Sequence, residues 1–191
     1  PVTVAQQLVS GGAAVLQLRM KIGSDRERVT LARALRELTR AARVPFVMND
    51  RADLALLVDA DGVHLGQDDL SLADARRLLG ARQLGVSTHD LQQAMDAERE
   101  GADLIGFGPV FDTVTKERPD PTVGLAQLAE VCRSVRVPVV AIGGLTPERA
   151  REAYRAGATW VAAISAVTTA SDVAAQARAF APESALREGT A

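Results

Sequence analysis

The sequence is poor in aromatic residues and cysteine, and it carries almost no net charge. Aromatic residues make up 3% of the 191 positions, which argues against a surface that stacks nucleic-acid bases. A formal net charge of −2 gives no overall attraction to nucleic acid or to an anionic membrane. The single cysteine, Cys132, cannot form an internal disulfide, and its apolar neighbours indicate a structural position. No apolar run approaches the ~18 residues of a membrane span, and no signal peptide is evident, so we expect a cytoplasmic protein.

Short apolar runs alternate along the chain with amphipathic stretches. The runs lack the polar alternation of a half-exposed strand, so they are predicted to be parallel strands buried on both faces. They cover 14–19, 44–48, 62–65, 84–87, 104–108, 137–142 and 159–164. Helical spacing and helix-start signals predict helices over 3–9, 25–43, 71–80, 88–100, 125–134, 146–157 and 171–180. This order predicts an α/β fold with a parallel sheet and helices outside it.

Seven predicted strands are one short of an eight-stranded barrel. We nevertheless predict a (β/α)8 TIM barrel, with the first strand missing from the given chain, because polar residues follow nearly every strand. The chain starts at Pro1 rather than Met, which suggests that it begins after its true start. A doubly wound open sheet is the alternative, and in that fold the polar residues should gather at one switch point. We expect one domain over 1–181 and a flexible tail over 182–191.

Charged and polar residues collect directly after the predicted strands, where a barrel would bring them to one mouth. Carboxylates at Asp50 and Asp69 are hard oxygen ligands that suit Mg²⁺ better than Zn²⁺. The cations and the hydroxyl- and glycine-containing turns suit phosphate oxygens. These residues are Gln17, Arg19, Lys21, Asn49, Gln67, Asp68, Ser87, Thr88, His89, Thr113, Thr115, Lys116, Gly143, Gly144, Ile164 and Ser165. Together they predict a site for a magnesium–diphosphate substrate.

Each of these residues also has a purely structural interpretation. Asp50 could cap the helix that follows it and pair with Arg51. Ser87 and Thr88 could cap a helix that begins at Thr88. We expect structural roles for His64, which lies inside a predicted strand, and for His89, which lies at a predicted helix start. The functional interpretation is favoured because all the polar positions lie at one end of one sheet.

Several separate motifs resemble, in order and spacing, those of the thiamine-phosphate synthase family. They are VLQLRMK, MNDRADLAL, DGVHLGQDDL, GVSTH, GADLIGFGPVFDTVTK, VPVVAIGGLT and VAAISA, and they run from residue 11 to residue 166. The resemblance implies a (β/α)8 barrel that joins hydroxymethylpyrimidine diphosphate to 4-methyl-5-(2-hydroxyethyl)thiazole phosphate. The implied products are thiamine phosphate and diphosphate, and the implied cofactor is Mg²⁺. The small-molecule substrates would be the partners of this chain, and a homodimer is possible.

The resemblance also implies a role for each matching residue. Asp50 and Asp69 match the magnesium ligands, and Thr113 and Thr115 match the loop that holds the thiazole phosphate. Gly144, Ile164 and Ser165 would complete that phosphate site. The contacts to the pyrimidine diphosphate would come from Gln17, Arg19, Lys21, Asn49, Ser87 and Lys116, of which Arg19, Lys21, Ser87 and Lys116 would assist catalysis. The charges would stabilise the departing diphosphate, and the aminopyrimidine can share the positive charge left on its methylene carbon. We therefore expect a dissociative reaction, in which the diphosphate leaves before the thiazole nitrogen attacks.

Two departures from the family pattern bear on this assignment. Met20 stands where the family has glutamate, and its alternation with Arg19 and Lys21 predicts that it points away from the mouth. The N-terminal strand of the family, of the type Y-x-x-T-D, is not in this chain. Two other functions remain possible from the residues: the related thiazole tautomerases, which need neither diphosphate nor metal, and a non-catalytic barrel that binds thiamine intermediates.

Overall fold

The computed structural model describes residues 1–113 and 121–182, which form seven parallel strands surrounded by helices. The strands are β1 (Leu16–Leu18), β2 (Phe46–Asn49), β3 (Gly62–Leu65), β4 (Gln83–Thr88), β5 (Leu104–Phe107), β6 (Val139–Ile142) and β7 (Trp160–Ala162). The helices are α1 (Val2–Ser10), α2 (Asp25–Ala42), α3 (Ala52–Leu57), α4 (Leu72–Leu79), α5 (Leu91–Arg99), α6 (Gly124–Ser134), α7 (Pro147–Arg155), α8 (Ser165–Thr168) and α9 (Val173–Ala179). All seven predicted strands are present.

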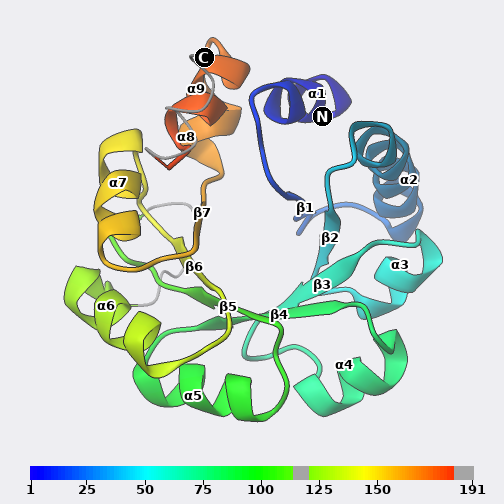
Figure 1. The fold of residues 1–191 in the computed structure, drawn as a ribbon. Coiled ribbons are helices and arrows are strands. Elements are labelled where there is room, and N and C mark those ends of the chain that lie inside the picture. The colour runs from blue at the N-terminus through cyan, green and yellow to red at the C-terminus, as the bar shows by residue number, and fades with distance from the viewer. Residues whose placement is uncertain (114–120, 183–191) are drawn as a thin grey trace.

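The strands pair in chain order, β1-β2-β3-β4-β5-β6-β7, and every pair is parallel. In a doubly wound sheet the strand order reverses at a switch point, so that neighbouring strands are not consecutive in the chain throughout. The unbroken order observed here shows that this alternative is wrong. The strands curl into an open ring with the helices outside (Figure 1), and in the described residues no strand bridges β7 and β1. The helical layer closes where the strands do not, because α1 packs against both α9 and α2. The prediction of a (β/α)8-type barrel is confirmed, with seven parallel strands in the described residues.

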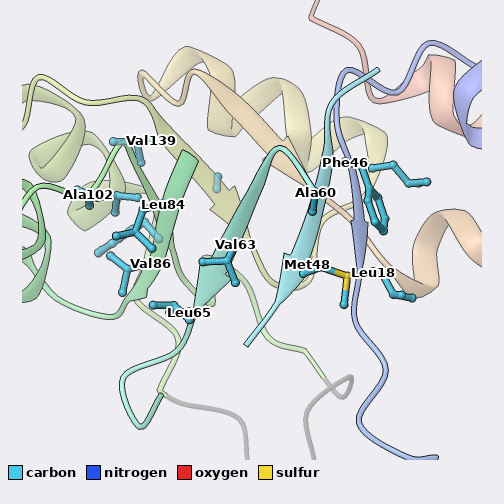
Figure 2. Packing of buried hydrophobic residues seen from close by; sticks show 14 of the residues in the cluster. Leu18, Phe46, Met48, Ala60, Val63, Leu65, Leu84, Val86, Ala102 and Val139 are labelled. Atoms are coloured by element: carbon cyan, nitrogen blue, oxygen red, sulfur yellow. The ribbon is translucent and has the colours of Figure 1, made fainter. Parts of the chain in front are cut away.

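The apolar core lies between the sheet and the helices. Val63 and Leu65 on β3 are at most 1% exposed and belong to this core, as Figure 2 shows with their neighbours on adjacent strands. Because successive side chains of a strand point to opposite faces, His64 between them points to the inside of the ring. The inner face is therefore free to carry polar residues and glycines, while burial of the outer face stabilises the barrel by about 25 cal/mol for each Å² of apolar surface.

Acidic residues tie the amino ends of the strands together. Asp61, directly before β3, accepts from the backbone N–H of Phe46 at the start of β2 (2.7 Å) and from Arg36 on α2 (2.7 and 3.0 Å). Asp103, directly before β5, accepts in the same way from the N–H of Leu84 on β4 (2.8 Å) and from Arg76 (2.7 Å). The residue before a strand thus satisfies the first free N–H of the preceding strand and fixes the register of the pair.

The structure corrects the predicted helix start at Thr88. Thr88 is the last residue of β4, is fully buried, and donates from its hydroxyl to the carbonyl of Gly106 (3.3 Å). Helix α5 begins only at Leu91, where Asp90 accepts from the N–H of Gln93 as the N-cap.

The structure also corrects the structural interpretation of Asp50, which does not cap α3, while the arginine after it, Arg51, pairs with Asp25 and Asp53. Helix α8 was not predicted, because four residues are too few for a helical period to be recognised.

Thr146 caps α7 with Pro147 in its first turn, as predicted. Residues 183–191 of the predicted tail lie outside the described residues. Among residues 1–113 and 121–182, none of the helices combines the length and the apolar composition of a membrane span.

Candidate active site

The carboxyl ends of β1, β2 and β3 bring one lysine and two aspartates together. Lys21 extends from the segment after β1 and forms an ion pair with Asp50, which directly follows β2. Asp69 follows β3, and its carboxyl group lies within hydrogen-bonding reach of that of Asp50. The two predicted metal ligands are therefore adjacent in space, although 19 positions separate them in the sequence.

Local backbone bonds hold both aspartates in place. Asp50 has a φ of +64°, and its N–H donates to the carbonyl of His64 (2.8 Å), which extends the pairing of β2 with β3 by one residue. Asp69 turns back on its own loop, where its carboxylate accepts from the N–H of Gly66 (2.6 Å). A non-glycine residue at positive φ is strained, so the strand pairing that imposes it also directs the Asp50 side chain to the mouth.

Electrostatics at this pair favour a bound cation. Burial raises the pKa of Asp69, and the neighbouring Asp50 raises it further, against the N–H of Gly66 and the charge of Lys21, which lower it. Two carboxylates that repel each other are stabilised when a divalent cation binds between them. No group of three or more histidine, cysteine, aspartate or glutamate residues able to hold a metal occurs in the described part of the chain. Mg²⁺ is usually held by one or two protein carboxylates, while water and phosphate oxygens fill its other coordination positions. Asp50 and Asp69 fit this pattern.

His64 contacts Ser87, one of the predicted substrate contacts. The ring Nε2 of His64 lies 2.9 Å from Ser87 Oγ on β4. The imidazole occupies a space left by two glycines of the inner face: a Cβ at Gly85 would lie 2.7 Å from its Nδ1, and one at Gly106 would lie 2.9 Å from its Cε1. Burial lowers the pKa of His64 to about 4, so the ring is neutral at neutral pH. The prediction of a merely structural His64 overlooked this contact.

The signal that could have revealed His64 is the spacing of the two glycines. Gly85 pairs with His64 across the β3–β4 ladder, and Gly106 pairs with Ser87 across the β4–β5 ladder. A glycine in a buried strand often marks a place where another group approaches closely. His89 differs from His64 in its partner: its Nδ1 lies 2.5 Å from a backbone oxygen, the carbonyl of Gly108, and not from the side chain of a predicted site residue.

The other residues predicted at the mouth lie around this group. Asn49 is the last residue of β2, and Gln67 donates to the carbonyl of Ser87 (2.6 Å). Gln17 in the middle of β1 and Arg19 directly after it are exposed, whereas Met20 packs against the apolar core, as its alternation predicts.

A second group of predicted residues lies after β5, β6 and β7. Gly144 follows β6 with a φ of +62°, and a Cβ there would lie 2.4 Å from the carbonyl oxygen of Asp112. This close approach joins the turn after β6 to the segment that contains Thr113. Ile164 and Ser165 stand at the start of α8, after β7. Thr115 and Lys116 lie outside the described residues.

The comparisons with known proteins agree on one family. The profile described as thiamine monophosphate synthase matches residues 1–167. The thiamine-phosphate synthase of Chloroflexus aurantiacus is 49% identical over 175 residues, covering 92% of this chain and 81% of that protein. The thiamine-phosphate synthase of Chlorobium phaeovibrioides is 46% identical, covering 99% of this chain and 90% of that protein.

A solved structure extends the agreement to the fold. The thiamine phosphate pyrophosphorylase of Pyrococcus furiosus is 36% identical, with a TM-score of 0.89, and the match covers 100% of this chain and 91% of that one. A 3-hexulose-6-phosphate synthase, at 17% identity and a TM-score of 0.67, shares the fold alone. The profile match over most of the chain, together with relatives above 45% identity, shows that this chain belongs to the thiamine monophosphate synthase family.

Proposed function

We propose that the chain condenses hydroxymethylpyrimidine diphosphate with 4-methyl-5-(2-hydroxyethyl)thiazole phosphate, giving thiamine phosphate and diphosphate. The observation that carries the proposal is the contact of Lys21, Asp50 and Asp69 at the ends of three neighbouring strands. A diphosphate leaving group needs a site that neutralises several negative charges, and these residues supply two metal ligands and a cation. Membership of the family supports the same reaction.

Mg²⁺ bound by Asp50 and Asp69 would neutralise charge on the diphosphate. Lys21 reaches the same place, since its ammonium group already contacts Asp50, and it can bind a diphosphate oxygen. Arg19, two positions earlier in the same segment, is exposed and adds a second positive charge. These pre-placed charges stabilise the negative charge that builds on the oxygen as its bond to the pyrimidine methylene carbon breaks.

The reaction then needs only positioning. The electron pair of the breaking bond leaves with the diphosphate, and the aminopyrimidine ring shares the positive charge that remains on the methylene carbon. The thiazole nitrogen attacks that carbon while its phosphate is held by Gly144, Ser165 and the segment of Thr113. No enzyme nucleophile is required, because holding the two reactants together supplies much of the acceleration.

The pairing of His64 with Ser87 has a role in this scheme. If Nε2 of His64 carries its proton, it donates to Ser87 Oγ (2.9 Å), and the serine hydroxyl proton is then directed to a substrate oxygen. His64 is therefore a positioning residue that acts through Ser87. Its neutral state suits this role, because burial lowers its pKa to about 4.

The experiment that tests the function mixes the two substrates with the purified chain and measures released diphosphate and thiamine phosphate, with and without Mg²⁺. We expect both products in equal amounts and a strict need for the divalent ion. Turnover of a thiazole carboxylate phosphate without metal would instead identify a tautomerase. Tight binding of both substrates without product would identify a carrier, and either result would reject the condensation.

A further inference from the structure

Arg149, in the first turn of α7, lies at the base of the turn formed by Gly143 and Gly144. Its Nη1 donates to the carbonyl oxygen of Gly144 (2.7 Å). Its guanidinium carbon lies 4.8 Å from the centre of the Phe111 ring. Phe111 belongs to the segment after β5. The side chain of Arg149 therefore contacts both the turn after β6 and the segment after β5, which carry site residues of the second group. The backbone N–H of Arg149 is itself fixed, because Thr146 accepts from it (3.3 Å).

The positive charge of Arg149 has no carboxylate partner among the described residues. No ion pair joins it to an acid of residues 1–113 or 121–182, although Arg151 on the same helix approaches Glu148 at 3.9 Å. Arg36 and Arg76, which are also partly buried, both bind aspartates. A half-buried guanidinium without a counter-ion attracts an anion to the place where it is held.

The turn beside Arg149 carries free backbone donors. The N–H groups of Gly143, Gly144 and Leu145 donate to no backbone carbonyl in the described part of the chain. The φ angles of +97° and +62° at Gly143 and Gly144 form the type of turn in which successive N–H groups can converge on an anion. Because the Gly144 carbonyl and the Leu145 N–H share one planar peptide unit, the bond from Arg149 also fixes the direction of that donor.

The two contacts of Arg149 hold the turn against the neighbouring segment. A Cβ at Gly144 would lie 2.4 Å from the carbonyl oxygen of Asp112 and 2.8 Å from Cβ of Phe111, so the two segments already touch. Arg149 binds the carbonyl of one and covers the ring of the other. Asp112 is fixed from the far side as well, since it accepts from the hydroxyl of Thr122 (2.5 Å).

We propose that Arg149 is a positioning residue that holds the Gly143–Gly144 turn and supplies the positive charge that selects the phosphorylated thiazole over the same thiazole without its phosphate. This inference rests on the proposed function, because it assigns the turn to the phosphate of that substrate. It concerns one substrate only. Lys21 and the two aspartates, which would bind the diphosphate, follow β1, β2 and β3, whereas Arg149 follows β6.

The test removes the charge and the substrate phosphate separately. We compare kcat/KM of the wild type, Arg149→Gln and Arg151→Gln with the thiazole phosphate and with the thiazole alcohol. Arg151→Gln is the matched control, because it removes the same charge from the same helix at a residue that pairs with Glu148. Arg149→Gln should lower kcat/KM for the phosphate about tenfold or more, as expected for loss of a charge-assisted contact. It should leave the value for the alcohol and the KM for the pyrimidine diphosphate unchanged.

Two outcomes of these kinetics overturn the inference. One is an equal loss with the phosphate and the alcohol, which would mean that the arginine merely maintains the fold. The other is a loss with Arg151→Gln as large as that with Arg149→Gln. Arg149→Lys keeps the charge but not the planar group above Phe111, and it should recover part of the loss. Melting temperatures of all variants exclude unfolding as the cause.

A binding measurement separates this inference from the proposed function. Calorimetry with inorganic phosphate should give weaker binding to Arg149→Gln than to the wild type or to Arg151→Gln. A wild type that makes no thiamine phosphate but shows this difference would reject the function and retain the anion site. Phosphate binding that is equal in all three proteins would reject the role of Arg149, whatever the activity.

Discussion

The two ends of the sheet use aspartate in opposite ways. At the amino ends, Asp61 and Asp103 each bind an arginine and a strand N–H, so their charges are fully compensated. At the carboxyl ends, Asp50 and Asp69 face each other, and burial together with that repulsion raises the pKa of Asp69. Asp61 and Asp103 bind the strands and helices that they join, whereas Asp50 and Asp69 repel each other even though Lys21 and the N–H of Gly66 bind them, which is typical of residues retained for a ligand.

The comparison also explains why one end can change function without loss of the fold. The amino-end acids fix the pairing of β2 with β3 and of β4 with β5, which positions the mouth residues that these strands carry. At the carboxyl ends, the side chains of Asp50 and Asp69 bind Lys21 and the N–H of Gly66, neither of which belongs to a strand, so they do not set the register of a strand pair. Variants at the two ends should therefore separate activity from stability.

The largest expected effect is on activity, in Asp69→Asn. The amide keeps the shape but is a weaker metal ligand, so turnover should fall by at least ~10²–10³, the loss typical of one pre-placed charge in a transition state. Stability should not fall, because the substitution removes the repulsion with Asp50. Released diphosphate and urea unfolding measure the two quantities. Near-normal turnover would reject the metal site.

The opposite pattern is expected for Asp61→Ala. The change leaves the N–H of Phe46 and the guanidinium of Arg36 without their acceptor, and Arg36 is only 13% exposed. The free energy of unfolding should fall by about 2 kcal/mol, the usual cost of a buried donor without a partner. Activity per folded molecule should remain. Asp61→Asn, which still accepts from Phe46, should lose less, and equal losses would contradict the proposed division of roles.

A smaller effect on activity is expected where His64 meets Ser87. His64→Leu should lower turnover about tenfold, since one hydrogen bond to a catalytic hydroxyl is lost, and combining it with Ser87→Ala should cost little more. Gly106→Ala tests the same contact without changing the histidine, because its Cβ would lie 2.9 Å from the ring. Additive losses in the double variant would show that His64 does not act through Ser87. The ¹⁵N spectrum of the imidazole, in a protein with two histidines, reports which nitrogen carries the proton.

The sequence alone predicted the strands and the acids that follow them, because continuous apolar runs end sharply at Asn49–Asp50 and at Gly66. It could not predict the contact between His64 and Ser87, which depends on the register of three strands and on space left by Gly85 and Gly106. The predicted boundary between β4 and α5 was also wrong, because the hydroxyl of Thr88 donates to a carbonyl of the neighbouring strand and does not cap a helix. Contacts between elements, and not local propensity, decided these cases.

The smallest expected effect concerns the pH dependence of stability at the amino end. A hydrogen bond from Arg82, followed by the charges of Arg40 and Arg36, lowers the pKa of Asp59 below its usual value. A carboxylate with a lowered pKa stabilises the fold above its unfolded pKa of ~3.9, and this contribution is lost as the pH falls through the lower folded value. Asp59→Asn should therefore lower stability slightly at pH 7 and match the wild type near pH 2. Urea unfolding of both proteins across this range would measure the difference, and a gap that widens in acid would show that Asp59 is not held ionised by its arginines.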